Sequence, residues 1–184
     1  RPHSVDTREK RVTAYIYEVE KHQQLWSQTI DDYIVLSTPA NERKRQETIF
    51  ELIYTEENFL NDLDYVIKMW MEPLKNSDII PIQRRERFLD KVFSNLIDIR
   101  NISTALTLAL RARQSQHPIV SQISDIMERF TTEFEPFVYY GARQHQAKHV
   151  YEHERYNNPK FALFAEVGFF YDKSWEEGGG DRCR

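Results

Sequence analysis

Apolar side chains recur at steps of three and four residues along most of this chain, and this period limits the possible folds more than any other feature. The period places those side chains on one face of an α-helix, and that face must be buried against other helices. Only 5 of the 184 residues are glycine and 7 are proline, so few positions interrupt a helix. The sequence therefore predicts an all-α fold. Long helices with short connections predict an elongated antiparallel helical bundle.

The first long helix is expected to begin at Thr38-Pro39. A threonine side chain can cap free N–H groups, and proline at the first helical position sacrifices no hydrogen bond. Pro73 should end or kink this helix near its last turn, and residues 76–81 should form a loop. The apolar face of the helix comprises Ile49, Ile53, Leu60, Leu63, Ile67, Trp70 and Leu74.

The same period predicts the remaining helices. A second long helix is expected over 85–113, with Phe88, Val92, Leu96, Ile99, either Ile102 or Ser103, Leu106 and Leu110 on its core face. A third is expected over 119–134, with Pro136 bending or interrupting it before the aromatic-rich segment 137–140, and a further helix is expected over 141–156. Asn158-Pro159 should cap a last helix that begins with Phe161, Phe164 and Ala165. Upstream, Ala14, Ile16, Val19 and Trp26 suggest one more helix.

Composition and charge favour a protein as the partner. The net charge is −4, and the basic residues are spread along the chain, which argues against a nucleic-acid surface. The only cysteine, Cys183, excludes an internal disulfide framework and indicates a reducing compartment. No run approaches the roughly 20 apolar residues that span a bilayer. We therefore expect a soluble, cytoplasmic protein.

One charged residue interrupts the first apolar face. Glu56 lies at helical spacing between Ile53 and Leu60, where a buried, unpaired carboxylate would cost free energy. Either Glu56 lies at the edge of the face, in water or paired with a nearby Lys or Arg, or it awaits a partner molecule. The pattern alone leaves both interpretations open.

Three segments resemble the Dbl-homology (RhoGEF) family. RQETIFELIYTEENFLNDLDYVIKMWMEPL, residues 45–74, is similar to the first conserved region, in which a Thr-Glu pair lies in an apolar frame. KVFSNLIDIRNISTALTLALRAR, residues 91–113, is similar to the second region, and YEHERYNNPKFALFAEV resembles the stretch before the third. The resemblance covers about residues 43–167 and is strongest to fungal exchange factors for Rho-type GTPases.

The resemblance implies a guanine nucleotide exchange factor that promotes GDP release from a Rho-type small GTPase in intracellular signalling. In the family, the glutamate of the Thr-Glu pair contacts switch I of the GTPase, and the matching residue is Glu56. Leu52 and Glu57 are further candidates for the same surface. No bond-making residue, cofactor, small-molecule substrate or bound nucleotide is implied for this chain.

The resemblance also implies a domain organisation. Residues 1–37 would be an N-terminal extension or linker, 38–167 a partial Dbl-homology domain and 168–184 a tail outside the family. The third conserved region is expected after Val167, where GFFYDKSWEEGGGDRCR stands instead, so the bundle is expected to be incomplete at its C-terminus. The alternative function is therefore a truncated, non-catalytic helical fragment that acts only as a protein-interaction module. Recruitment to the cell cortex would depend on modules absent from this chain.

Two other groups of side chains have a spacing that could form a site. His145, His149 and His153 share one helical face in a geometry that could hold a metal, but a solvated polar face is the simpler interpretation, and we predict no metal site. Bundle di-iron sites need Glu-x-x-His pairs, which this chain lacks. The aromatic residues Phe137, Tyr139 and Tyr140 are expected to pack in the core and not to form a stacking platform.

Overall fold

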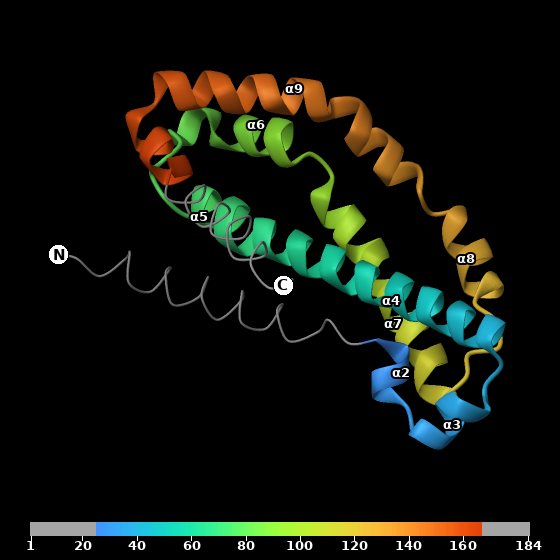
Figure 1. The fold of residues 1–184 in the computed structure, drawn as a ribbon. Coiled ribbons are helices and arrows are strands. Elements are labelled where there is room, and N and C mark those ends of the chain that lie inside the picture. Colours follow the sequence, from blue (N-terminus) through green and yellow to red (C-terminus); the bar gives the residue numbers. More distant parts are fainter. Residues whose placement is uncertain (1–24, 167–184) are drawn as a thin grey trace. The chain divides into compact units, whose positions relative to one another are not determined.

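The computed structural model describes residues 25–166, which form helices and connecting segments with no β-strand among them. The all-α class is confirmed. The helices are α2 (Trp26–Thr29), α3 (Asp32–Ser37), α4 (Ala40–Val66), the π-helical turn η1 (Ile67–Met71), α5 (Glu72–Lys75), α6 (Ile82–Phe93), α7 (Leu96–Gln116), α8 (Ser124–Thr131) and α9 (Glu135–Asn157) (Figure 1). Residues 159–166 are also helical. The helix predicted around residues 14–19 and the tail after Val167 lie outside the described residues.

The described residues fall into two compact units. One, here called the α4–α8 unit, comprises residues 25–64 and 97–137. The other, here called the α6–α9 unit, comprises residues 65–96 and 138–166. Each unit has its own buried side chains.

α4 begins within two residues of the predicted start, but the predicted cap is wrong. Thr38 Oγ1 donates a 2.6 Å hydrogen bond to the carbonyl of Ile34 and so closes the end of α3. The carbonyl of Pro39 accepts the first helical bond of α4, from the N–H of Arg43 at 2.9 Å. Because a threonine hydroxyl can bond to backbone on either side of it, the sequence did not determine which helix it would serve.

Pro73 is preceded by a π-helical turn, and the helix ends only two residues after it. Proline lacks an N–H, and its ring excludes the carbonyl four residues earlier, which belongs to Met69. Ahead of it, η1 is closed by a bond from the N–H of Glu72 to the carbonyl of Ile67, five residues back. The backbone stays helical to Lys75, so the predicted kink or end takes the form of a π-helical turn.

The helix predicted over 85–113 is two helices. α6 ends at Phe93 and α7 begins at Leu96. Ser94 between them has a φ of 49°, a left-handed conformation in which a right-handed helix cannot continue. The apolar period runs across this break and therefore hides it. On α7, Ser103 takes the core position and is 1 % exposed, which resolves the choice between Ile102 and Ser103.

α8 is shorter than the helix predicted over 119–134. It begins at Ser124, because the backbone of Val120 bonds to a side chain of α4 instead of to a helical neighbour. Val120 N–H donates to Gln46 Oε1 at 2.9 Å, and the Val120 carbonyl accepts from Gln46 Nε2 at 2.8 Å. This tertiary contact therefore explains why residues 119–123 do not belong to α8, although the apolar period predicted that they would.

α9 is longer than predicted and continuous. The break falls at 132–134, and Pro136 lies in the first turn of α9, where a missing N–H costs nothing. The predicted interruption after Pro136 and the separate helix over 141–156 are therefore wrong. The predicted cap at Asn158 is confirmed, since its Oδ1 accepts from the N–H groups of Lys160 and Phe161 at 3.1 and 3.3 Å.

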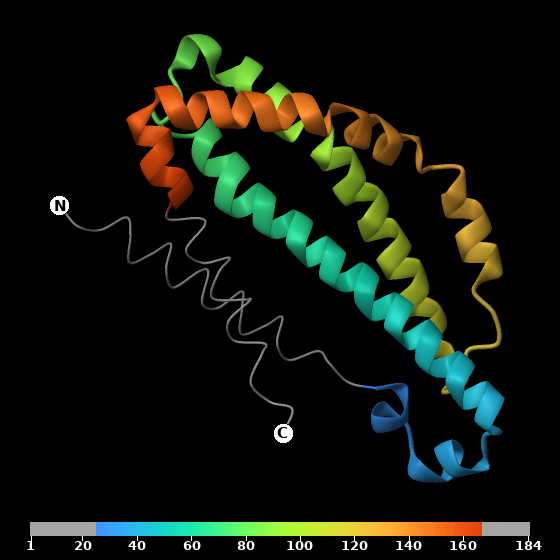
Figure 2. The ribbon, with the colours of Figure 1, turned by 45° about the horizontal axis from the view of Figure 1, so that its top comes forward.

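Aliphatic side chains dominate the core of the α4–α8 unit. Its buried members are Ile49, Ile53, Leu106, Leu110, Val120, Ile126 and Phe130. Ion pairs join Glu57 to Arg111 and Asp64 to Arg100, so residue numbers rise along α4 as they fall along α7. The two helices therefore run antiparallel, and they lie side by side in both views (Figures 1 and 2).

The core of the α6–α9 unit contains a cluster of aromatic rings beside aliphatic side chains such as Leu74 and Ile80. Phe161 is fully buried, with its ring centre 5.3 Å from Phe88, 5.4 Å from Tyr151 and 6.3 Å from Phe164. Trp70 meets Phe164 edge to face at 5.5 Å. Burial of the Phe161 and Phe164 rings in this cluster stabilises the helix over 159–166.

Candidate functional site

Glu56 lies on α4 in the α4–α8 unit, one turn from the buried side chain of Ile53. Its own side chain is half-buried. Within residues 25–166 no hydrogen bond or ion pair reaches its carboxylate. Burial raises its pKa above the ordinary value of 4.5, because desolvation disfavours the charged form. Of the two interpretations that the sequence left open, the structure therefore excludes pairing with a described Lys or Arg.

Leu52 lies one turn before Glu56 on the same side of α4 and is partly buried. Residues four apart on a helix are surface neighbours, so an apolar side chain borders the acid. Such a neighbour limits access of water to the carboxylate while leaving it open to a partner. The structure therefore brings two of the three predicted contact residues together.

Glu57 is turned away from that pair, because successive residues on a helix differ by about 100°. Its carboxylate accepts two hydrogen bonds from the guanidinium of Arg111 on α7, whose Nη1 also donates to Gln114 Oε1 at 2.6 Å. A bidentate pair of this kind fixes the geometry of α4 against α7. The structure thus gives Glu57 an internal partner, and its contact with a GTPase stays a prediction.

Phe59 is a neighbour of Glu56 that was not among the predicted contact residues. It lies three residues beyond Glu56 and is 37 % exposed. Its ring lies 6.2 Å from that of Phe137 at the start of α9, and Phe137 in turn contacts Phe134 at 5.2 Å. Phe59 could have been predicted from the sequence, because it is the aromatic residue that follows the Thr-Glu pair. Phe137 is only partly buried, although it packs on two other rings, and the predicted core packing is wrong for Tyr139, which is 45 % exposed.

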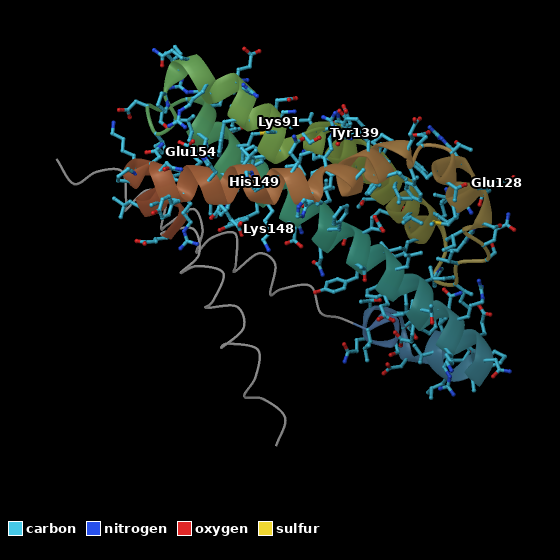
Figure 3. The ribbon with its side chains drawn as sticks, turned by 90° about the horizontal axis from the view of Figure 1, so that it is seen from above. Lys91, Glu128, Tyr139, Lys148, His149 and Glu154 are labelled. Atoms are coloured by element: carbon cyan, nitrogen blue, oxygen red, sulfur yellow. The ribbon has the colours of Figure 1, made fainter. Side chains whose placement is uncertain are left out.

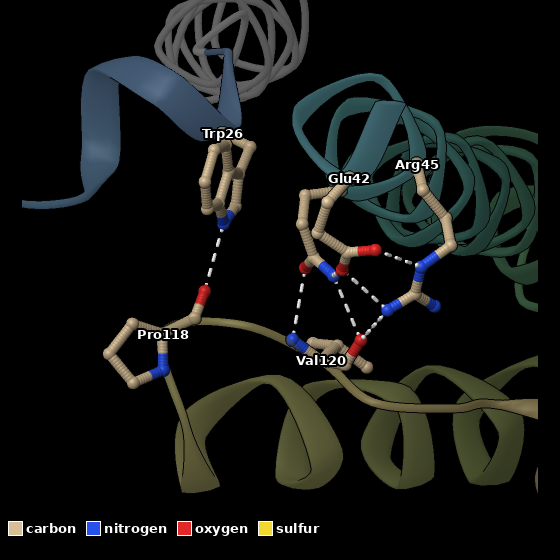
Figure 4. A network of polar contacts seen from close by, with 6 residues as sticks. Trp26, Glu42, Arg45, Pro118 and Val120 are labelled. Carbon is tan, nitrogen blue, oxygen red and sulfur yellow. Dashed lines mark hydrogen bonds and ion pairs between the residues drawn. The ribbon is translucent and has the colours of Figure 1, made fainter. Parts of the chain in front are cut away.

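A polar network holds the start of α4 (Figure 4). Trp26 is 2 % exposed, and its indole N–H donates to the Pro118 carbonyl at 2.9 Å. The Glu42 carboxylate accepts from Arg45 Nε and Nη2 and from Gln46 Nε2, and these bonds lower its pKa to about 2, with the Arg45 bonds contributing most. The network fixes α2 and the segment before α8 against the helix that carries Glu56.

Comparison with protein families matches residues 48–168 to the RhoGEF domain. The chain belongs to this family. The match contains Glu56 and Leu52 as well as α7 and α9, so the resemblance of the three sequence segments is confirmed. No described helix is both long and apolar enough to cross a membrane.

Fungal relatives share much of the sequence. Rho1 guanine nucleotide exchange factor 1 of Schizosaccharomyces pombe is 41 % identical over 145 residues, which are 79 % of this chain and 11 % of that protein. Rho1 guanine nucleotide exchange factor 2 of the same yeast is 39 % identical over 145 residues, or 12 % of its length. The chain thus spans about a tenth of the length of these relatives.

A human relative and a solved structure agree with this assignment. Human Rho guanine nucleotide exchange factor 26 is 32 % identical over 121 residues, which are 65 % of this chain and 13 % of that protein. The crystal structure of human RhoA in complex with a DH/PH fragment of PDZRHOGEF superposes with a TM-score of 0.69, 23 % identity, and coverage of 78 % of this chain and 41 % of that one. This likeness shows the Dbl-homology helical fold.

Proposed function

We propose that this chain promotes GDP release from a Rho-type small GTPase in intracellular signalling. The observation that carries the proposal is the half-buried Glu56 carboxylate, which has no partner among the described residues and stands at the Thr-Glu position of a RhoGEF-family helix. A carboxylate held on a rigid helix can accept hydrogen bonds from a loop of the partner, and those bonds would compensate its desolvation.

The activity would need no bond-making step. Contacts that are stronger with the nucleotide-free GTPase than with its GDP-bound form shift the GTPase toward release of GDP. GTP then enters by mass action. Glu56 and Leu52 would contact the switch region, and Glu57 would act mainly by holding α4 on α7.

Three features belong to the same proposal. Residues 38–167 would form the Dbl-homology part of the chain, with 1–37 as an extension and 168–184 as a tail. The site of action would be cytoplasmic. Recruitment to the cell cortex would come from other modules.

Release of a fluorescent GDP analogue from Rho-, Rac- and Cdc42-type GTPases tests the proposal. The chain should accelerate release, and Glu56→Ala should lower that acceleration at least about tenfold, a loss of about 1.4 kcal/mol in transition-state stabilisation. Glu51→Ala is the matched control, because Glu51 is an exposed glutamate on α4 about 140° around the helix from Glu56.

Circular dichroism should first show that all three proteins are equally helical. Acceleration that survives Glu56→Ala in full would exclude the assigned role of Glu56. Binding to the nucleotide-free GTPase without any acceleration would instead support the alternative of an interaction module.

A further inference from the structure

Three histidines follow one another at four-residue steps on α9: His145, His149 and His153. All three are exposed, as the solvated-face interpretation expected. Figure 3 locates His149 and its neighbour Lys148 on α9. Within residues 25–166, none of the three imidazoles takes part in a hydrogen bond or ion pair. Their ring nitrogens are therefore available to a ligand from solution.

The backbone of α9 sets the spacing of these rings. α9 is helical without a break from Glu135 to Asn157, and residues four apart on a helix have Cβ atoms about 5–6 Å apart. Imidazole nitrogen binds Zn²⁺ at about 2.0–2.1 Å. Two rings on neighbouring turns can therefore reach one ion, with water completing its coordination. His145 and His153 are about 12 Å apart along the axis, which is too far for one ion to join both.

Although the sequence pattern alone predicted no metal site, we propose that α9 carries a surface chelate site for a divalent transition-metal ion, in which His149 pairs with either His145 or His153, because all three imidazoles are exposed and unpaired within residues 25–166. No group of three or more His, Cys, Asp or Glu among the described residues is placed to hold a metal ion, so the site is a two-imidazole chelate and not a closed centre. Neutral imidazole selects ions such as Zn²⁺, Ni²⁺ and Cu²⁺ over Mg²⁺ and Ca²⁺. The site is independent of the exchange activity proposed above.

The charges beside the histidines are compatible with cation binding. Glu152 lies on the same side of α9, with its carboxylate 3.9 Å from Lys148 Nζ. Both side chains are largely exposed, so this ion pair is weak and can rearrange when a cation binds. Glu152 thus offsets the charge of Lys148 next to the site.

Titration of the full chain, free of any polyhistidine tag, with Zn²⁺ in a calorimeter tests the proposal. His149→Ala removes both pairs and should lower the Zn²⁺ affinity at least about tenfold. An ion bound by one imidazole then no longer meets a second imidazole at high effective concentration. His145→Ala or His153→Ala leaves one pair and should lower the affinity only about twofold. The double variant His145→Ala/His153→Ala should match His149→Ala.

His117→Ala is the matched control, since His117 is an exposed histidine outside α9. It should leave the Zn²⁺ affinity of the site unchanged, and Mg²⁺ should not bind there. Zn²⁺ should also raise the melting temperature of the parent chain but not that of His149→Ala, because binding stabilises only the form that holds the chelate. Unchanged Zn²⁺ affinity in His149→Ala would overturn the proposal. So would a loss of affinity in His145→Ala or in His153→Ala as large as that in His149→Ala.

Discussion

Different kinds of side chain stabilise the two units of this RhoGEF-family chain. The α4–α8 unit buries isoleucine, leucine and valine between long helices, and its ion pairs lie at half-exposed positions. The α6–α9 unit buries a cluster of aromatic rings around Phe161 together with a carboxylate, that of Glu154, which is 3 % exposed. In the first unit the charges surround the core, whereas in the second a charge is part of it.

This difference shows how the same helical period can produce two kinds of interior. Aliphatic side chains at regular spacing pack with little directional requirement. The Glu154 carboxylate, in contrast, needs specific partners, and it accepts bonds from Arg84 and, at 2.6 Å, from Asn158 Nδ2. Asn158 also donates to the Ile79 carbonyl at 2.8 Å. The α6–α9 unit should therefore be the more sensitive to loss of a charged partner.

The largest effect is expected from Phe161→Ala, which removes the centre of the aromatic cluster. It should lower the free energy of unfolding by about 3–5 kcal/mol through lost burial and a residual cavity. Ile53→Ala is the counterpart in the α4–α8 unit and should cost about 2–5 kcal/mol. Urea unfolding measures both values. Amide hydrogen exchange should rise first in the unit that carries the substitution, and equal loosening of both units by either variant would contradict the division into two units.

Glu154→Gln tests the buried charge with little change of shape. Loss of its charge-assisted bonds to Arg84 and Asn158 should cost about 1.5–3 kcal/mol. Lys160→Ala is the control, because its pair with Asp78 is exposed on both sides and should contribute less than about 1 kcal/mol. Equal effects of the two variants in urea unfolding would show that the position of the charge in the core does not matter.

Thr107→Val should stabilise the α4–α8 unit. The Thr107 hydroxyl is buried on α7 without a hydrogen-bond partner in the described part of the chain, so replacing it with a methyl group removes a desolvation penalty of about 1 kcal/mol. The melting temperature should rise by about 2–4 °C for a chain of this size. Thr104→Val is the matched control on the same helix, because the Thr104 hydroxyl donates to the Arg100 carbonyl at 2.7 Å. A decrease in melting temperature for Thr107→Val would show that the hydroxyl has an acceptor in solution.

The smallest effect is expected at Glu42, in the network at the start of α4. Its pKa is lowered from 4.5 to about 2, so the folded chain binds fewer protons than the unfolded chain in that interval. The stabilisation is therefore complete above pH 4.5 and is lost as the pH falls towards 2. Glu42→Gln should reduce the difference between the urea midpoints at pH 7 and pH 3. Glu51→Gln, at an exposed glutamate of the same helix, should leave that difference larger than Glu42→Gln does.

Two errors in the predicted helices occurred where one hydrogen-bonding group had two possible partners. Thr38 bonded to α3 and not to α4, and Val120 bonded to Gln46 instead of to a helical neighbour. At Ser94 the apolar period continued through a turn and concealed it. In each case the local sequence permitted both outcomes. A bond to the preceding helix selected one at Thr38, a contact distant in sequence did so at Val120, and the backbone conformation did so at Ser94.

The candidate site was predicted in part. The motif placed Glu56 and Leu52 on one side of a helix, because a spacing of four residues fixes that relation in any α-helix. The same motif did not separate Glu57 from them, because its pairing with Arg111 joins residues 54 positions apart in the chain. Nor did it show that Phe59 would border the site through contact with Phe137.

The sequence by itself determined the all-α class, the apolar faces of α4 and α7, the cap at Asn158 and the family, because these depend on residues within a few helical turns. The tertiary structure decided where α8 begins, that a left-handed Ser94 separates α6 from α7, that Glu154 is buried and that Glu57 has a partner while Glu56 has none among residues 25–166. The physical reason is that the cost of burying a charge or a backbone group depends on which partner reaches it, and helical periodicity carries no information about partners distant in sequence.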